Sequence, residues 1–197
     1  MVSRIEPLEP GQADDDQANQ ILTESEEGWY KDSAYFGVLA HLPRFLRRLV
    51  ATFRLFPSSD QIDTETLELM RLRVAAIHGC AYCGTVRTWE VRKEIKPKED
   101  AIFAEEIDTS VLTRREELAV RVADYMSRDP QTMPDAFFEE LRMEYTDETI
   151  LELLLFAALE VGLDRFCIAL RLDTTEQSPY PTGLEYPLDR GLWQEEQ

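Results

Sequence analysis

The sequence predicts an all-α fold in a single domain. Its 197 residues contain no sustained alternation of polar and apolar positions and no Asn-Gly or Asp-Gly hairpin turn, which are the usual signals of β-strands. Apolar residues at helical spacing recur instead, and several of these runs begin at a helix-capping residue. A chain of this length can bury a substantial core, so one domain is expected.

Helices are predicted in most of the chain. In order, the helical segments are residues 15–27, 33–56, 61–79, 81–94, 99–106, 113–126, 134–145 and 146–172. Within the second segment, Pro43 is expected to begin a new helix, because the first turn does not need the N–H group that proline lacks. In the third segment, Asp63 is a suitable N-cap and Gly79 a suitable stop.

The later segments carry equally local signals. Thr113 and Glu116 match the Thr-x-x-Glu capping box, and Pro134 suits the first turn of the next helix. Thr146 is the expected cap of the longest helix. That helix is apolar on all sides over residues 153–159, so we expect it at the centre of the domain or in a subunit interface.

The end of the chain differs from the helical body. Residues 173–197 contain prolines, tyrosines and a tryptophan without helical period. Disordered tails usually lack aromatic residues, so we expect an extended arm that lies on the helical domain (residues 1–172) or on a neighbouring subunit. A loose tail is the alternative, since chain ends are often poorly ordered.

Charge and composition exclude several classes of protein. A formal net charge of −18 disfavours nucleic acid and anionic membranes as partners. The first residues lack the apolar core of a signal peptide, and the longest apolar run, residues 153–159, is too short to span a bilayer. We therefore expect a cytoplasmic protein. Three cysteines do not make a disulfide scaffold, and in a reducing compartment a close pair favours catalysis or metal binding.

The candidate site is the stretch AAIHGCAYCGTVR, which holds Cys80 and Cys83. If one helix ends at Gly79 and the next begins at Ala81, both cysteines lie at a helix N-terminus, where unpaired N–H groups favour a thiolate. Arg87 falls on the same helical stripe, four residues after Cys83, and its charge would stabilise the thiolate further.

Two other interpretations of the pair stay open. Cys80 and Cys83 could be small core residues, since free cysteine is commonly buried. They could also be half of a zinc site, completed by His78 and by His41 or Cys167. No second C-x-x-C and no H-x-x-x-H pattern is present, so we expect neither a metal nor a cofactor. Cys167 itself lies among apolar residues and is expected in the core.

The stretch LELMRLRVAAIHGCAYCGTVR resembles the signature of the carboxymuconolactone decarboxylase and alkylhydroperoxidase D-like superfamily. Redox members of this superfamily carry a glutamate twelve positions before a C-x-x-C pair, and here that position is Glu68. The resemblance covers roughly residues 4–172. It implies a helical bundle, an obligate homo-oligomer, and a thiol–disulfide cycle that reduces hydroperoxides with a dithiol donor such as a lipoyl group.

The sequence departs from that signature at one position. The family histidine, four residues after the second cysteine, is replaced by Arg87, which stays protonated and cannot relay a proton. Glu68 could remain as the base or form an ion pair with Arg87. His78 is either a cap for the end of its helix or a substitute in proton transfer. The predicted catalytic set is therefore Cys80, Cys83, Glu68, Arg87 and His78.

Three functions remain to be compared. The first is a thiol-dependent peroxidase or disulfide reductase acting on a small molecule. The second is a decarboxylase or isomerase of small lactones, in which Arg87 and Arg73 would hold an anionic substrate. The third is a non-catalytic redox sensor or oligomeric binding module. Glu160, Asp164 and Arg165 interrupt an apolar helix, either as i,i+4 and neighbour pairs at a helix boundary or with one of them beside the thiols.

Overall fold

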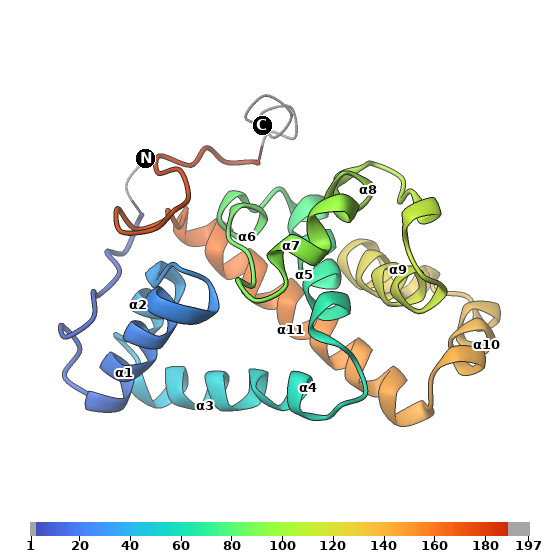
Figure 1. Cartoon of the computed structure of the whole chain (residues 1–197), viewed down its shortest axis with the longest axis horizontal. Coiled ribbons are helices and arrows are strands. Elements are labelled where there is room, and N and C mark those ends of the chain that lie inside the picture. The colour runs from blue at the N-terminus through green and yellow to red at the C-terminus, as the bar shows by residue number, and fades with distance from the viewer. Residues whose placement is uncertain (1–2, 189–197) are drawn as a thin grey trace.

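The computed structural model, which describes residues 3–188, is all-helical and confirms the predicted fold class (Figure 1). The α-helices are α1 (Asp16–Glu24), α2 (Ala34–Leu39), α3 (Pro43–Phe53), α4 (Leu55–Ser58), α5 (Thr64–His78), α6 (Ala81–Thr85), α7 (Arg92–Ile95), α8 (Glu99–Phe103), α9 (Arg114–Arg128), α10 (Asp135–Glu144) and α11 (Asp147–Leu170). Short 3₁₀ or π turns lie at Ser25–Trp29, Lys96–Lys98, Thr109–Val111 and Pro130–Thr132. None of the helices in the described part of the chain is both long enough and apolar enough to cross a membrane.

The predicted helix ends are confirmed where they depend on local capping. Asp63 accepts a hydrogen bond from the Thr66 amide, and Gly79 ends α5 in the left-handed conformation with φ 69°. Both hydrogen bonds of the capping box at Thr113 are present. These signals act within one helical turn, so they work whatever surrounds the helix.

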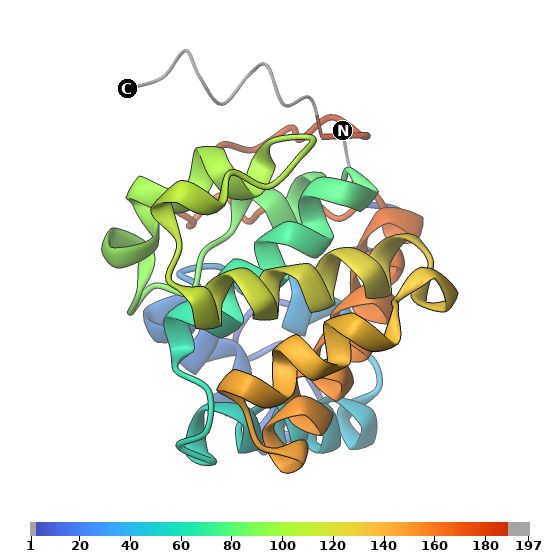
Figure 2. The same ribbon diagram turned by 90° about the vertical axis from the view of Figure 1, so that its right-hand side faces the viewer.

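The centre of the domain is α5, which packs against α9 and α11. Every residue from Thr66 to Ala76 is buried, so this helix is covered on all sides. In Figure 1, α9 and α10 lie at the right and α1 and α2 at the left. Figure 2 turns the side formed by α9 and α10 towards the viewer. The apolar helix α11 is not the centre, because Leu151 and Leu155 on its outer face are 66% and 54% exposed. A subunit interface for that face stays a prediction.

The helix predicted over residues 81–94 is wrong after Thr85, where α6 ends and Val86 becomes extended. Arg71 on α5 takes the carbonyl groups of Cys83 and Val86 as hydrogen-bond acceptors, at 2.7 and 2.6 Å. In a continued helix those carbonyls would accept from backbone amides further along the chain. The hydrogen-bond donor at the end of α6 therefore comes from another helix, and the sequence around Thr85 does not predict that α6 ends there.

Residues 173–188 contain turns and bends but no helix or strand, and they lie against the helical body (Figure 1). The Tyr186 hydroxyl donates to the Leu172 carbonyl and accepts from the Tyr82 amide, which ties this segment to α6. The Leu188 amide donates to the Gly79 carbonyl at 2.8 Å. The segment therefore covers the outer side of the turn that carries the cysteines. Residues 189–197 of the predicted arm lie outside the described residues.

Candidate active site

Cys80 and Cys83 are joined as a disulfide, with their Cα atoms 5.4 Å apart. Gly79 turns the chain after α5, and Cys80 then becomes the N-cap of α6, as the sequence predicts for the helix start. The Cys83 amide donates to the Cys80 sulfur at 3.3 Å. Because α6 has only five residues, its dipole is small. The polar interaction with the Cys80 sulfur therefore comes from the Cys83 amide and not from a long helix.

The two sulfurs differ in access. Cys80 is fully buried, whereas Cys83 keeps exposed surface and lies in the wall of a cavity of about 430 Å³. Most of that wall is aromatic or aliphatic, with side chains from the N-terminal helices, α6 and α11; they include Trp29, Tyr30, Phe36, Phe53, Tyr82 and Trp89. A reagent that enters the cavity therefore meets Cys83 and not Cys80.

Glu68 lies in a network of hydrogen bonds and does not line the cavity. Arg71 binds it through two hydrogen bonds of 2.8 and 2.6 Å, and the Thr88 amide and hydroxyl donate to the same carboxylate at 3.0 and 2.7 Å. Burial alone would raise the pKa of Glu68, but the charge and hydrogen bonds of Arg71 outweigh it and the net pKa is lowered. Glu68 is thus ionised and structural. Its ion-pair partner is Arg71, not Arg87.

The prediction that Arg87 shares a stripe with the cysteines is wrong, because α6 ends before it. Its Nε donates to Glu99 at 2.8 Å, and its Nη1 donates to the carbonyl groups of Gly84 and Thr85. Arg87 does not line the cavity. The arginines that do line it are Arg54 and Arg71, and Arg71 also donates to the Cys83 carbonyl. The sequence predicts that Arg71 lies near Glu68, but it does not predict that Arg71 is buried.

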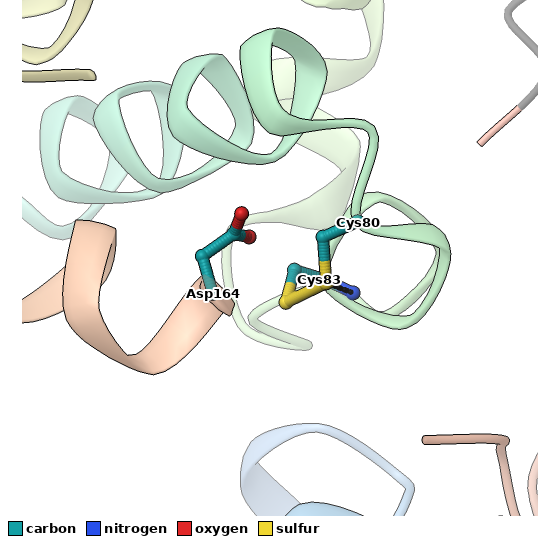
Figure 3. A group of neighbouring side chains, drawn as sticks. All are labelled: Cys80, Cys83 and Asp164. Atoms are coloured by element: carbon teal, nitrogen blue, oxygen red, sulfur yellow. Dashed lines mark hydrogen bonds between the residues drawn. A yellow bond between two sulfur atoms is a disulfide. The ribbon is translucent and has the colours of Figure 1, made fainter. Parts of the chain in front are cut away.

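His78 does not cap α5 but reaches across to α11. Its Nδ1 lies 2.8 Å from the Asp164 carboxylate, and its Nε2 lies 3.3 Å from the Ser127 carbonyl. A carboxylate oxygen of Asp164 and the two cysteine sulfurs all lie within 4.8 Å of one another (Figure 3). Burial raises the pKa of Asp164, against the opposing effect of His78. Of the three charged residues that the sequence offered as a neighbour of the cysteines, Asp164 is therefore the one that lies beside both sulfurs.

The same geometry limits the zinc alternative. Among the described residues, the group that could ligate a metal is Cys80, Cys83 and Asp164, and its sulfurs are free to bind only when the disulfide is reduced. His41 faces the Glu6 carbonyl instead. Cys167 is buried in the apolar cluster around α6, as expected for a core residue, and burial raises the pKa of its thiol.

Glu160 is a second unusual carboxyl group in the cavity wall. Burial raises its pKa to about 8, only partly offset by the charge of Arg71. Its partly accessible surface faces this apolar cavity, so bulk water does not solvate the charge well. Glu160 is thus largely protonated at neutral pH.

We expect Glu160→Gln to stabilise the protein at high pH. At pH values between 4.5, the ordinary pKa of glutamate, and about 8, its pKa in the folded protein, Glu160 is ionised in the unfolded chain but protonated in the folded chain. Stability therefore falls as the pH rises through this range, by a few kcal/mol at most. The variant lacks this loss and should be about 1–3 kcal/mol more stable than wild type at high pH, with no such gain at low pH. Urea unfolding at the two pH values measures the difference, and an equal effect at both would contradict the assignment.

Comparison with known proteins identifies relatives of the fold. No protein-family model matches the sequence. YdfG of Bacillus subtilis strain 168, an uncharacterized protein, is 24% identical over 118 residues, which are 58% of this chain and 80% of YdfG.

Two solved structures match over most of their length. An uncharacterized peroxidase-related protein from Ralstonia eutropha JMP134, an alkylhydroperoxidase AhpD core, superposes with a TM-score of 0.72 at 19% identity, covering 90% of this chain and 94% of that one. The debrominase Bmp8 superposes with a TM-score of 0.71 at 18% identity, covering 88% and 92%. The resemblance in sequence and the match in structure agree: this chain has the fold of the alkylhydroperoxidase AhpD core.

Proposed function

We propose that this protein is a thiol–disulfide oxidoreductase that reduces a hydroperoxide with Cys83 and Cys80. The observation that carries the proposal is a disulfide with one sulfur in the wall of an apolar cavity and the other sealed behind it. A reactive cysteine must be reached by its substrate, and its resolving partner must be close enough to bond with it. Cys83 meets the first requirement and Cys80 the second.

The proposed cycle balances with two thiols and one hydroperoxide. The Cys83 thiolate attacks the terminal oxygen, the O–O bond breaks, and an alcohol leaves with one proton. The Cys80 thiol then attacks the sulfur of the Cys83 sulfenic acid, the S–O bond breaks, and the hydroxyl leaves as water with the Cys80 proton, which forms the disulfide. Two cysteine thiols have been oxidised to a disulfide, and the hydroperoxide has been reduced to alcohol and water.

The electron donor should be a narrow dithiol, since of the two disulfide cysteines Cys83 alone lines the cavity, and residues 173–188 cover the other side of the turn. A lipoyl-type dithiol has this shape and returns two electrons by successive thiol–disulfide exchanges. A homo-oligomer, in which further copies pack on exposed faces of the bundle, stays part of the proposal.

A steady-state assay with cumene hydroperoxide and dihydrolipoamide tests the proposed function. We expect continuous consumption of peroxide that depends on both substrates. If one equivalent of peroxide forms the disulfide but dihydrolipoamide sustains no turnover, the protein is a redox sensor. If iodoacetamide trapping finds both thiols free and unmodified after excess peroxide, the thiol chemistry itself is contradicted.

A second candidate, reductive dehalogenation, is favoured by the size and aromatic lining of the cavity. The debrominase Bmp8 has the same fold, and a cysteine-to-alanine variant of it is known in complex with 2,3,4-tribromopyrrole. In such a reaction two thiols and an aryl bromide give the disulfide, the dehalogenated ring and hydrogen bromide. Bromide release from 2,3,4-tribromopyrrole, measured beside peroxide consumption, separates the two candidates.

The decarboxylase alternative is weakened, because neither of the two arginines that the sequence offered for it lines the cavity. Arg87 is paired with Glu99, and Arg73 is paired with Asp124 and donates to backbone carbonyl groups, away from the cavity. An anionic lactone in the cavity would meet Glu160 and Asp164 as well as Arg54 and Arg71, and Arg71 is already bonded to Glu68 and to two backbone carbonyl groups.

A further inference from the structure

Reduction of the disulfide creates a problem at the buried cysteine. When a dithiol attacks Cys83, the S–S bond breaks and Cys80 must leave with the electron pair. Cys80 has no exposed surface, so water cannot solvate or protonate the thiolate that forms. The single polar contact to its sulfur among the described residues is the Cys83 amide, at 3.3 Å. A proton donor near Cys80 would remove this cost.

Asp164 occupies the place where such a donor is needed. It is 2% exposed, and its carboxylate lies within 4.8 Å of both sulfurs (Figure 3). One oxygen bonds to His78, while the other has no hydrogen-bond partner among the described residues. A buried carboxylate oxygen without a partner is costly when ionised, which favours the protonated form.

The contacts of His78 define how many protons this pair holds. The Ser127 carbonyl can only accept, so the His78 Nε2 that faces it carries a hydrogen. The remaining nitrogen, Nδ1, and the Asp164 oxygen then share one proton between them, on either the imidazole or the carboxyl group. His78 keeps some exposure, with 9% of its side chain accessible, so this proton can be replaced from solvent.

The charged and titratable groups around Asp164 come from four directions. They are His78 and Arg71 on α5, Glu160, Arg165 and Cys167 on α11, the two cysteines of the α6 turn, and Tyr186 in the C-terminal segment. Arg71 is committed to Glu68 and backbone carbonyls, and Arg165 is exposed. None of these groups combines a transferable proton with the position of Asp164 beside both sulfurs.

We propose that Asp164, positioned by His78, donates the proton that Cys80 takes when the disulfide is reduced. The proposal rests on the thiol–disulfide function proposed above. The donor thiolate bonds to Cys83, the S–S bond breaks, and Cys80 leaves as the thiol with the proton of Asp164. The second thiol of the donor then displaces Cys83. In the oxidative direction, Cys80 gives its proton to Asp164 as it attacks the sulfenic acid, and that proton leaves with the released water.

Stopped-flow reduction of the disulfide by dithiothreitol tests this role between about pH 5.5 and about pH 9, with rates expressed per dithiothreitol thiolate. In the wild type, this rate constant should fall as Asp164 loses its proton. In Asp164→Asn it should be about 10²-fold lower at low pH and no longer change with pH. Glu148→Gln, an exposed carboxyl on the same helix, is the matched control and should follow the wild type.

His78→Gln provides a second test, which remains available if the Asp164→Asn variant does not fold. Glutamine cannot exchange the proton, so the pH at which the rate falls should move, even if the rate at low pH is retained. An unchanged profile in either variant would overturn the proposal. Because dithiothreitol reduction needs no peroxide, a protein that shows the Asp164-dependent profile but never turns over hydroperoxide would refute only the proposed function.

Discussion

Cys83→Ser is expected to lower peroxide turnover by about 10³-fold or more, because serine cannot replace a thiolate nucleophile. Cys80 cannot take over, since it is fully buried and does not line the cavity. The measurement is consumption of cumene hydroperoxide with dihydrolipoamide as donor, together with the count of alkylatable thiols after peroxide treatment. In this variant the Cys80 thiol should stay alkylatable after unfolding.

Cys80→Ser should behave differently, because Cys83 still faces the cavity. One equivalent of peroxide should be consumed, leaving a sulfenic acid that dimedone traps, and the cycle should then stop for lack of a resolving thiol. Cys167→Ala removes the third cysteine and should leave disulfide formation intact. If Cys80→Ser is inert and Cys83→Ser reacts once with peroxide, the assigned roles are reversed.

Arg71→Met is expected to destabilise the protein by about 3–5 kcal/mol, because it leaves the Glu68 charge buried without its ion-pair partner. Glu68 is 2% exposed, and Arg71 supplies two of the four hydrogen bonds to its carboxylate. The substitution also removes the donors to the Cys83 and Val86 carbonyls. Urea unfolding monitored by circular dichroism measures the loss.

Two further variants separate these contributions. Arg165→Met removes an exposed arginine and should change stability by no more than about 0.5 kcal/mol. The double variant Glu68→Gln/Arg71→Met has no unpaired buried charge and should recover part of the loss. What remains measures the hydrogen bonds that end α6. A loss of under about 1 kcal/mol in Arg71→Met would show that the network contributes little to stability.

The sequence by itself determined the helical class, the first residues of most helices and the position of the cysteine pair. Asp63, Gly79, Thr113 and Thr146 act on backbone groups within one turn of themselves, so their effects are independent of the rest of the fold. The spacing of Cys80 and Cys83 likewise places both sulfurs at one turn, close enough to bond.

Only the tertiary structure decided which groups surround the sulfurs. Arg71 donates to the carbonyl groups of Cys83 in α6 and of Val86 just after it, and Arg87 beyond this end bonds to Glu99. Asp164 reaches His78 from 86 residues away, and nothing in the two segments pairs these residues with each other. Such contacts depend on how α5, α6 and α11 pack, because a buried charge takes whichever partner lies within hydrogen-bond distance, however distant it is along the chain.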